Sequence, residues 1–513
     1  MTWWKHAVVY QIYPRSFADS DGDGVGDLPG ITAHLDHLVD LGVDALWLSP
    51  FYRSPMADFG YDVSDYTDVD PLFGTLADAD QMIDAAHARG LRVIVDWVPN
   101  HSSDRHPWFQ ASRSSRDDPR RDWYVWRDGA PDGGPPNGWR SQFSRSGPAW
   151  THDARTGQWY LHSFLPEQPD LNWANPEVEE AMLGTLRFWL ERGVDGFRID
   201  VAHLLGTDPV PAHDEPLTPR NADWPRGRAV LRRVRDLLES YGDRMAVGEV
   251  YLLDQRRLVG FVADGDGLHL AHNFVFLRVP WEAARIRAVV EEWEEHADGR
   301  AWPCWCLENH DHSRVATRFG GVARARAALV LLLALRGTPF LFQGQELGLP
   351  DAEVPAARVV DVDGRDPERA PIPWRRPSEA GPGAGFTTGE PWLPIVAEAE
   401  ELAVEAQAAD PASTLALTRA LLGLRRAHPA LHAGDQAFHD LGEGLLAWSR
   451  ASGDDRWLAL VDTTGRPRRV DASPVLAAAR RMLSSRPGRS EAVDVARVEL
   501  EADEAVLLQE VRP

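Results

Sequence analysis

The sequence predicts an α/β protein built on a (β/α)8 TIM barrel, with a subdomain inserted after the third strand and a C-terminal antiparallel β-sandwich domain. Segments with apolar residues at three- and four-residue spacing alternate with short, continuously apolar strands. Continuous apolar strands are typical of parallel sheets that are buried on both faces. One long segment and the C-terminal part of the chain break this alternation, which locates the two additional domains.

Four units of the barrel follow one pattern: an amphipathic helix, a glycine, and an apolar strand that ends in a polar residue. Leu35, Leu38 and Val39 illustrate the helical spacing, and the glycine after each helix suits a left-handed cap. The predicted helices cover residues 31–41, 76–89, 176–192 and 226–241, and the strands that follow them cover residues 45–49, 92–100, 196–200 and 245–249.

Further apolar segments bring the number of predicted strands to eight: residues 7–13, 272–276, 302–307 and 339–342. Eight strand–helix units favour a closed barrel, in which active sites lie at the carboxyl ends of the strands. An open doubly wound sheet is the alternative, but no glycine-rich fingerprint follows any of the strands.

Breaks in the pattern divide the chain into three predicted domains. Residues 101–170 are rich in Trp, Arg, Gly and Pro, and structureless loops of that length are rare, so an inserted subdomain B is expected there. Short strand-like pieces at residues 444–449 and 456–461, and others after them, predict a small β domain. The barrel is therefore assigned to residues 1–100 and 171–430, and the C-terminal domain to residues 431–513.

The composition disfavours several classes of function. The 54 basic and 78 acidic residues give a net charge of −24, which disfavours nucleic acids and anionic membranes as partners. Lys5 is the only lysine, which disfavours lysine-dependent nucleotide and Schiff-base chemistry. Residues 327–335 form the longest apolar run, far shorter than the ~20 residues that span a bilayer. Cys304 and Cys306 are expected to be buried and unbridged. Residues 1–17 contain no secretory signal, so we expect a cytoplasmic protein. We also expect a monomer or homodimer, and no organic cofactor.

Acidic residues stand at or just beyond the ends of predicted strands: Asp96, Asp200, Glu249 and Asp311. Because the strand ends of a barrel converge on one opening, these side chains are expected to be neighbours. A single residue of this kind could simply cap the next helix. Four of them in one chain favour a catalytic site.

The surroundings of two of these carboxyl groups suggest different protonation states. Arg198 precedes Asp200 by two positions, so both side chains share one strand face and the arginine can keep the carboxylate ionised. Glu249 follows the apolar residues 245–248, a setting that favours the protonated, acidic form. One ionised and one protonated carboxyl group are what glycosidic bond cleavage requires. The 21 tryptophans include candidates for binding the apolar faces of sugar rings, although most are expected in the core.

Sequence motifs at the strand ends resemble those of a known family. They are residues 96–101 (Asp-Trp-Val-Pro-Asn-His), 196–200 (Gly-Phe-Arg-Ile-Asp), 248–250 (Gly-Glu-Val) and 308–311 (Glu-Asn-His-Asp). In this order and spacing they resemble the α-amylase family of glycoside hydrolases (family 13). Residues 3–17 are similar to its α-glucosidase and oligo-1,6-glucosidase branch. The resemblance runs along nearly the whole chain and is weakest in the C-terminal domain.

The resemblance implies an exo-acting, retaining α-glucosidase that releases glucose from the non-reducing end of short α-glucosides in a blind pocket. In such enzymes the two catalytic carboxyl groups lie roughly 5–5.5 Å apart and a covalent glucosyl-enzyme forms. Carried over by position, the catalytic residues are the nucleophile Asp200, the general acid/base Glu249 and the transition-state stabiliser Asp311. The implied substrate-binding residues are Arg198, His101 and His310 around the reacting sugar, Tyr61 stacked on it, and Asp58 with Arg369 on its terminal hydroxyl groups.

An aspartate-rich loop at residues 19–27 predicts a structural Ca²⁺ or Mg²⁺ site, which the glucosidase branch also has at this place. Its ligands would be the side chains of Asp19, Asp21, Asp23 and Asp27 and the carbonyl of Val25, in the pattern of a calcium loop. Gly30 stands where such a loop has its closing glutamate. A solvated Asp/Gly turn is the alternative, although crowding four carboxylates without a cation is costly.

Departures from the family pattern leave the substrate open. Residues 342–346 (Phe-Gln-Gly-Gln-Glu) and 369–372 (Arg-Ala-Pro-Ile) replace the usual Tyr-Gln-Gly-Glu-Glu and Arg-Thr-Pro-Met, which bears on how the leaving sugar binds. Val201 often accompanies action on α-1,6 links in this branch, whereas Ala202 and His203 resemble broad α-glucosidases. A transglucosylase, or a sucrose-acting or isomerising enzyme, on the same scaffold is the nearest alternative. A catalytically inactive relative or a carbohydrate-binding protein would not need all three catalytic carboxylates.

Overall fold

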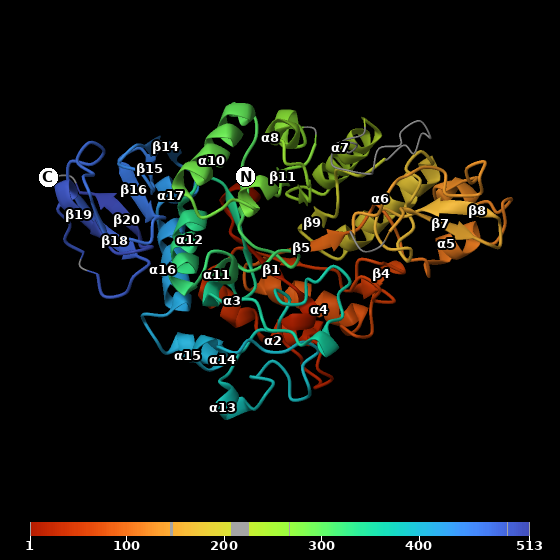
Figure 1. The fold of residues 1–513 in the computed structure, drawn as a ribbon, viewed down its shortest axis with the longest axis horizontal. Helices are drawn as coiled ribbons and strands as arrows, with labels where there is room; N and C mark the ends of the chain where they lie inside the picture. The colour runs from red at the N-terminus through yellow and green to blue at the C-terminus, as the bar shows by residue number, and fades with distance from the viewer. Residues whose placement is uncertain (1, 144–146, 207–224, 266, 490, 512–513) are drawn as a thin grey trace.

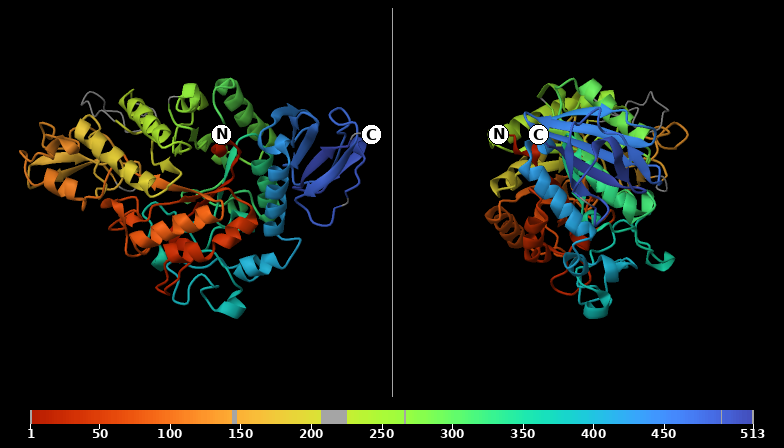
Figure 2. Two further views of the ribbon diagram at one scale, coloured as in Figure 1. Left: turned by 180° about the vertical axis from the view of Figure 1, so that it is seen from behind. Right: turned by 90° about the vertical axis from the view of Figure 1, so that its left-hand side faces the viewer.

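The computed structural model describes residues 2–143, 147–206, 225–265, 267–489 and 491–511. Figure 1 shows a central barrel with the C-terminal strands on one side of it and the segment between β5 and α6 on the other. The reverse view in Figure 2 shows the same order along the longest axis of the molecule. The barrel therefore separates the two additional domains.

The barrel sheet contains eight strands in the order β11, β10, β9, β5, β2, β1, β13, β12, and each pairing between neighbours is parallel. Between the two ends of this order, His272 Nδ1 lies 3.8 Å from Cys304 Sγ. The strands are β1 (Val9–Ile12), β2 (Ala45–Leu48), β5 (Arg92–Trp97), β9 (Gly196–Ile199), β10 (Met245–Gly248), β11 (Leu270–Ala271), β12 (Cys304–Cys306) and β13 (Thr338–Phe342). The prediction of a parallel (β/α)8 barrel is confirmed.

Alternate strand residues form a separate apolar cluster that includes Val9, Met245 and Phe340. Cys304 and Cys306 belong to it, because positions two apart on a strand point to the same face. Both cysteines are buried and free, as predicted.

One predicted strand is wrong. Residues 272–276 were expected to be extended, but β11 ends at Ala271 and α9 (Phe274–Leu277) follows almost at once. The reason is local: the Asn273 side chain accepts a hydrogen bond from the backbone N–H of Phe276 and so caps a helical turn. The apolar residues of this segment give no period that distinguishes a short buried helix from a strand.

Helices surround the barrel. As predicted, a glycine ends a helix: Gly42 closes α3 in the left-handed conformation with φ 99°. At the start of α4, Thr75 and Asp78 form a reciprocal capping box. The single helix predicted at residues 31–41 is divided into α2 and α3. The longer helices and their neighbours are α2 (Leu28–Ala33), α3 (Leu35–Leu41), α4 (Leu76–Ala88), α6 (Pro176–Glu191), α7 (Pro225–Ser240), α10 (Ala283–Ala297), α12 (Val322–Ala334) and α16 (Thr414–Ala427). Shorter ones are α1 (Trp3–His6), α8 (Gln255–Val259), α11 (Val315–Arg318), α13 (Pro377–Ala380), α14 (Ala399–Leu402), α15 (Val404–Ala408) and α17 (Pro429–His432).

The segment inserted after β5 has its own small core. It contains α5 (Pro107–Ser112) and a sheet of β6 (Trp126–Arg127), β8 (Gln158–Leu161) and β7 (Trp150–Asp153). Phe109 of α5 stacks on Trp126 with ring centroids 5.7 Å apart. An antiparallel bridge between His101 and Asp170 joins the two ends of the insertion at its base. A further hairpin, β3 (Tyr52–Arg53) and β4 (Asp65–Val69), lies between β2 and α4.

The C-terminal part is antiparallel, as predicted. One sheet has the order β14, β15, β16, β20, β18, and a second sheet pairs β17 with β19. Leu458 and Val506 of the larger sheet share a buried core with Val470 and Val498 of the smaller one. The strands are β14 (Asp435–His439), β15 (Leu445–Ser452), β16 (Asp455–Asp462), β17 (Arg468–Val470), β18 (Ala479–Ser484), β19 (Val498–Leu500) and β20 (Ala505–Glu510).

The C-terminal part of helix α12 is apolar around its whole circumference, which suits its position between the barrel and the C-terminal sheet. It packs against β16, β20 and α16, and its residues from Ala327 to Ala334 are all buried. Within the described residues, no helix combines the length and the apolar composition that crossing a membrane would require.

Candidate active site

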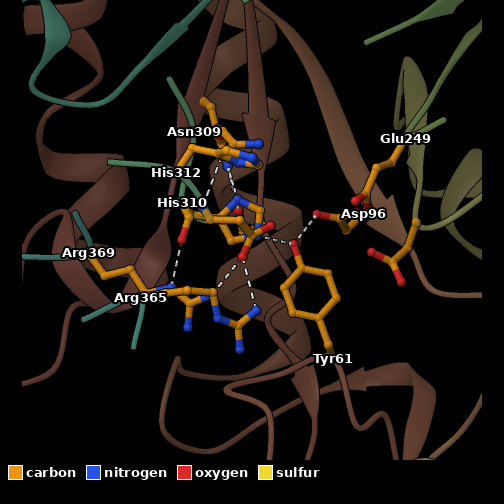
Figure 3. A network of polar contacts seen from close by, with 12 residues as sticks. Tyr61, Asp96, Glu249, Asn309, His310, His312, Arg365 and Arg369 are labelled. Carbon is orange, nitrogen blue, oxygen red and sulfur yellow. Dashed lines mark hydrogen bonds and ion pairs between the residues drawn. The ribbon is translucent and has the colours of Figure 1, made fainter. Parts of the chain in front are cut away.

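A cavity of about 310 Å³ lies at the carboxyl ends of the barrel strands. Six residues that the sequence predicted for the site line it: Asp58, Tyr61, His101, Asp200, Glu249 and Asp311. The other three, Arg198, His310 and Arg369, lie behind this wall with at most 1 % of their surface exposed. Figure 3 shows how the groups converge, with Glu249 and Asp96 on one side and the two arginines Arg365 and Arg369 on the other. The structure thus brings all nine residues together, six at the cavity surface and three beneath it.

Arg198 connects three carboxyl groups. Its Nη1 lies 2.7 Å from Asp200 Oδ1 and 2.7 Å from Asp96 Oδ1, and its Nη2 lies 2.5 Å from Glu249 Oε2. The predicted contact between Arg198 and Asp200 is therefore present. Glu249, in contrast, is not in the purely apolar setting expected from the strand that precedes it. One guanidinium neutralises only part of the charge of the three carboxylates.

The electrostatics of Asp200 differ from the sequence expectation. Burial raises the pKa of Asp200 most, Arg198 lowers it, and the carboxyl groups of Glu249 and Asp96 raise it again, so that it lies well above its usual range. Asp200 therefore holds its proton to higher pH than a solvated carboxyl group does.

Asp96 lies beneath the catalytic carboxyl groups and is completely buried. It accepts hydrogen bonds from Trp47 Nε1 at 3.1 Å and from the Tyr61 hydroxyl at 3.2 Å, besides its contact with Arg198. Burial raises the pKa of Asp96 to about 6, although Arg198 acts in the opposite direction. Asp96 therefore competes with Asp200 for the positive charge of Arg198.

Asp311 faces these groups in the same cavity and has cationic partners of its own. Its Oδ1 lies 3.0 Å from Arg365 Nη1 and 2.9 Å from Arg369 Nη2. Burial alone would raise the pKa of Asp311, but His310, Arg365 and Arg369 together lower it to far below its usual range. Asp311 is therefore a carboxylate near neutral pH.

Arg365 is a site residue that the sequence reasoning missed. It lies 2.7 Å from Asp58 Oδ1 and 2.7 Å from Asp361 Oδ1, and it lines the cavity. Arg369, which the resemblance places with Asp58 on the terminal hydroxyl groups, donates to the carbonyl of His310 at 2.7 Å. The ion-pair partner of Asp58 is Arg365. Residues 361–365 form neither a helix nor a strand, so no periodic spacing indicated this contact.

The insertion contributes to the same end of the cavity. Gln168 Nε2 donates to Asp58 Oδ2 at 3.0 Å and lies 3.1 Å from His101 Nε2, a contact that no motif indicated. Phe143 and Phe164 of the insertion also line the cavity. Burial lowers the pKa of His101 to about 3, so this imidazole is neutral near neutral pH.

Tyr61 and His310 form a stacked pair at the base of the cavity. Their rings are nearly parallel, with centroids 5.5 Å apart, and the Tyr61 hydroxyl lies 2.7 Å from His310 Nε2. The other ring nitrogen of His310 lies 2.8 Å from Gln11 Nε2. The flat face of Tyr61 is thereby held in place, as a platform for an apolar sugar face requires.

Val201 carries backbone strain directly after Asp200. Its φ is 36°, a conformation that is rare for a β-branched residue. In this conformation its N–H points at Glu249 Oε2, 3.3 Å away. Strain of this kind is found at functional sites, where the surrounding structure enforces it.

The aspartate-rich loop gathers three of its four predicted side-chain ligands. Carboxylate oxygens of Asp19, Asp21 and Asp27 lie within 4.8 Å of one another, whereas Asp23 is not in this group. Burial and the other three aspartates raise the pKa of Asp23, while the N–H of Val25 lowers it. The loop packs closely on residues 387–391, since a Cβ at Gly24 would lie 2.0 Å from the carbonyl oxygen of Glu390. The oxygen donors and their crowding fit a divalent cation.

A parallel barrel with a carboxylate pair, a third carboxylate and a shared arginine at its strand ends defines a glycoside hydrolase. The chain belongs to the α-amylase family, because the model of the α-amylase catalytic domain matches residues 11–434. The protein is therefore an enzyme of this family, as the sequence motifs predicted.

Similar proteins of known name indicate which members of the α-amylase family this chain resembles. A probable alpha-glucosidase of Rhizobium meliloti (strain 1021) is 43% identical over 497 residues, covering 89% of each chain. An oligo-1,6-glucosidase of Parageobacillus thermoglucosidasius is 38% identical over 479 residues, covering 83% of this chain and 84% of the relative. Among solved structures, the alpha-glucosyl transfer enzyme XgtA superposes with a TM-score of 0.92 at 41% identity, and each chain is covered completely. The similarity is thus to enzymes that process small α-glucosides.

Proposed function

We propose that the protein is an exo-acting, retaining α-glucosidase that releases glucose from the non-reducing end of short α-glucosides of the maltose or isomaltose type. The observation that carries the proposal is the contact of one buried arginine, Arg198, with both Asp200 and Glu249 at the wall of a cavity that Asp311 also lines. The similarity to an α-glucosidase and an oligo-1,6-glucosidase supports it.

Asp200 and Glu249 perform the two bond changes of the proposed mechanism. Glu249 donates its proton to the glycosidic oxygen while a carboxylate oxygen of Asp200 attacks the anomeric carbon, so the bond to the leaving group breaks and a glucosyl ester forms. Glu249 then accepts a proton from water, whose oxygen displaces Asp200 and gives glucose with its α configuration retained.

Asp311 stabilises the positive charge that develops on the sugar ring. Arg365, Arg369 and His310 lower its pKa and hold it in place as a carboxylate, so no reorganisation is needed as the charge appears. Tyr61 binds the apolar face of the same sugar, and its hydroxyl is fixed by His310.

The closed end of the cavity binds the terminal hydroxyl groups in this proposal. Asp58 accepts hydrogen bonds from them and Arg365 donates, whereas Gln168 and His101 complete the wall. Charged groups in ion pairs give the strongest selection for hydroxyl groups, because a missing partner leaves them buried and unsatisfied. In this proposal the buried groups Asp58, Gln168 and His101 stop a longer sugar chain at this end, which would give exo action.

Asp19, Asp21 and Asp27 would hold a structural Ca²⁺ or Mg²⁺. The cation would neutralise their mutual repulsion and tie the loop to residues 387–391, with no part in the chemical step.

Glucosyl transfer is the second candidate, because the transfer enzyme XgtA is 41% identical and fully covered. The same glucosyl ester would then react with a sugar or alcohol hydroxyl in place of water. Hydrolysis and transfer differ only in the acceptor, so the carboxylate geometry supports both.

A substrate panel on the purified enzyme tests the proposal. Maltose, isomaltose and an aryl α-glucoside should release α-glucose by proton NMR, while sucrose and trehalose test isomerising alternatives and added alcohols test transfer. Internal cleavage of maltodextrins would refute exo action, and an initial β-anomer would refute retention. Asp200→Asn should lower kcat by about 10⁴-fold or more, whereas the exposed control Asp36→Asn should leave it unchanged.

A further inference from the structure

A second cleft, of about 290 Å³, lies between the barrel and the C-terminal domain. One wall is the beginning of α16 with Ser413, Ala416 and Leu417, and the other is β18 with the turn that follows it. Figures 1 and 2 show α16 and the C-terminal strands side by side at this end of the molecule. None of its lining residues belongs to the catalytic cavity.

The lining of this cleft contains more basic than acidic residues. Its one acidic residue is Glu491, and its four arginines are Arg326, Arg481, Arg486 and Arg489. Arg326 comes from α12 of the barrel, and the other three come from the C-terminal domain. Such a concentration of positive charge is unexpected in a chain whose net charge is −24.

The arginines differ in how their charge is compensated. Arg489 lies 3.1 Å from the buried Glu504 and 3.5 Å from Glu501. Arg326 donates to the carbonyl of Ser485 at 2.7 Å and to Thr414 Oγ1 at 3.2 Å, and Arg486 donates to the carbonyl of Ala502 at 2.6 Å.

Neither Arg326 nor Arg486 has a carboxylate partner within ion-pair distance in the described part of the chain. These two guanidiniums also repel each other. Burial lowers the pKa of Arg326 most, and the charge of Arg486 lowers it further. Both side chains are half-buried, and both also line an adjoining cleft of about 400 Å³. An arginine that merely extends into water would not be held beside a second one, because surface side chains can move apart.

The charges and hydrogen-bond donors of Arg326 and Arg486 indicate which kind of ligand this cleft would bind. Asp410 offsets part of the positive charge of Arg326 from beyond ion-pair distance. The two guanidiniums together still favour an anion that carries two charges and several acceptor oxygens. A phosphoryl group has both, and its oxygens match the planar fork of arginine donors. The apolar parts of Leu417 and Leu483 in the lining reduce the local dielectric and strengthen that attraction.

We propose that this cleft binds a small phosphate-bearing molecule, with the phosphoryl group held between Arg326 and Arg486. Because these residues come from α12 and from the C-terminal domain, the bound anion links the two domains. The ligand therefore acts on stability and domain packing, and it leaves the chemistry of the distant catalytic cavity unaltered.

Thermal unfolding of the full-length enzyme tests the proposal. Inorganic phosphate should raise Tm in a saturable manner, above the effect of sodium chloride at equal ionic strength. A hexose monophosphate, compared with glucose alone, distinguishes a phosphate ester from free phosphate as the ligand. Equal shifts with phosphate and chloride would overturn the proposal.

Variants identify the site. Arg486→Gln should weaken phosphate binding about tenfold or more in calorimetric titration, because a charge-assisted contact is removed. Arg480→Gln is the matched control, since Arg480 lies on β18, the strand that leads into the turn of Arg486, is exposed and contacts Gln509 outside the cleft. Both variants should retain wild-type kcat/KM on an aryl α-glucoside, which shows that they are folded. Unchanged phosphate affinity in folded Arg486→Gln enzyme would refute the site.

Discussion

Replacing Arg365 by glutamine tests whether Arg365, as the ion-pair partner of Asp58, contributes to sugar binding. Arg365 contacts Asp58 and Asp361 at 2.7 Å and Asp311 at 3.0 Å. Asp311 keeps Arg369 as a partner after the change, but the Asp58 carboxylate keeps Gln168 as a donor and only the more distant charge of Arg369. The loss therefore falls on Asp58, whose pKa burial already raises.

The magnitude follows from the ion pair that Asp58 no longer makes. One buried, charge-assisted hydrogen bond contributes about 1.5–3 kcal/mol, and leaving its partner unpaired brings the cost to about 3–5 kcal/mol. If about 3–4 kcal/mol of this appears in sugar binding, kcat/KM falls about 10²–10³-fold, at 1.4 kcal/mol for each factor of ten. We expect the fall in kcat/KM for Arg365→Gln to appear with maltose and with an aryl α-glucoside alike, since both present the same terminal glucose.

The matched comparison is Arg365→Lys, which retains the charge but not the fork of donors. It should recover part of the activity, because one ammonium can still reach one carboxylate. Circular dichroism and Tm show whether each variant is folded. A folded Arg365→Gln enzyme with kcat/KM within about twofold of wild type would refute the reasoning and return the role to Arg369.

Other predictions concern pH and metal. Asp96→Asn removes a negative charge that raises the pKa of Asp200 and frees Arg198 for it, so the acid limb of the pH profile of kcat/KM should move to lower pH; a shift to higher pH would contradict this electrostatic account. Burial lowers the pKa of His272 to about 3, so this imidazole is neutral in the folded protein. Between about pH 6.5 and 3 the unfolded chain therefore binds one more proton than the folded protein, and the free energy of unfolding falls as the pH is lowered through that window. His272→Phe should reduce the slope of unfolding free energy against pH by up to about 1.4 kcal/mol per pH unit there, and an unchanged slope in urea titrations would exclude His272 as its source. Dialysis against EDTA should lower Tm and added Ca²⁺ should restore it, with neither effect in Asp19→Asn; a Tm that is insensitive to EDTA would argue against the cation.

The barrel was predictable because its signals are local. The strands at residues 45–49 and 92–100 are apolar on both faces, and each is preceded by a helix whose end a glycine marks. The contact of Arg198 with Asp200 was predictable for the same reason, since two residues on one strand face need no tertiary information. The prediction for residues 272–276 failed because Asn273 converts apolar residues into a capped helical turn.

The contacts that the sequence did not predict are made by loops that are distant from Asp58 along the chain. Arg365 and Arg369 are four residues apart, and only the path of their loop decides which one meets Asp58, 307 residues earlier. Gln168 reaches Asp58 because the insertion folds back on its own base. The raised pKa of Asp200 depends on Asp96 and Glu249, which share Arg198 with it, and nothing in the spacing of these residues revealed that competition.

The incomplete neutralisation around Arg198 has a consequence for inhibition. One guanidinium contacts the three carboxyl groups of Asp96, Asp200 and Glu249 and cannot neutralise all of them, so the potential at this buried site is negative. The cavity is thus a preformed counter-ion for a flattened, positively charged sugar ring. An amine analogue of glucose with a protonated nitrogen at the anomeric position should bind far more tightly than glucose itself, although both present the same hydroxyl groups.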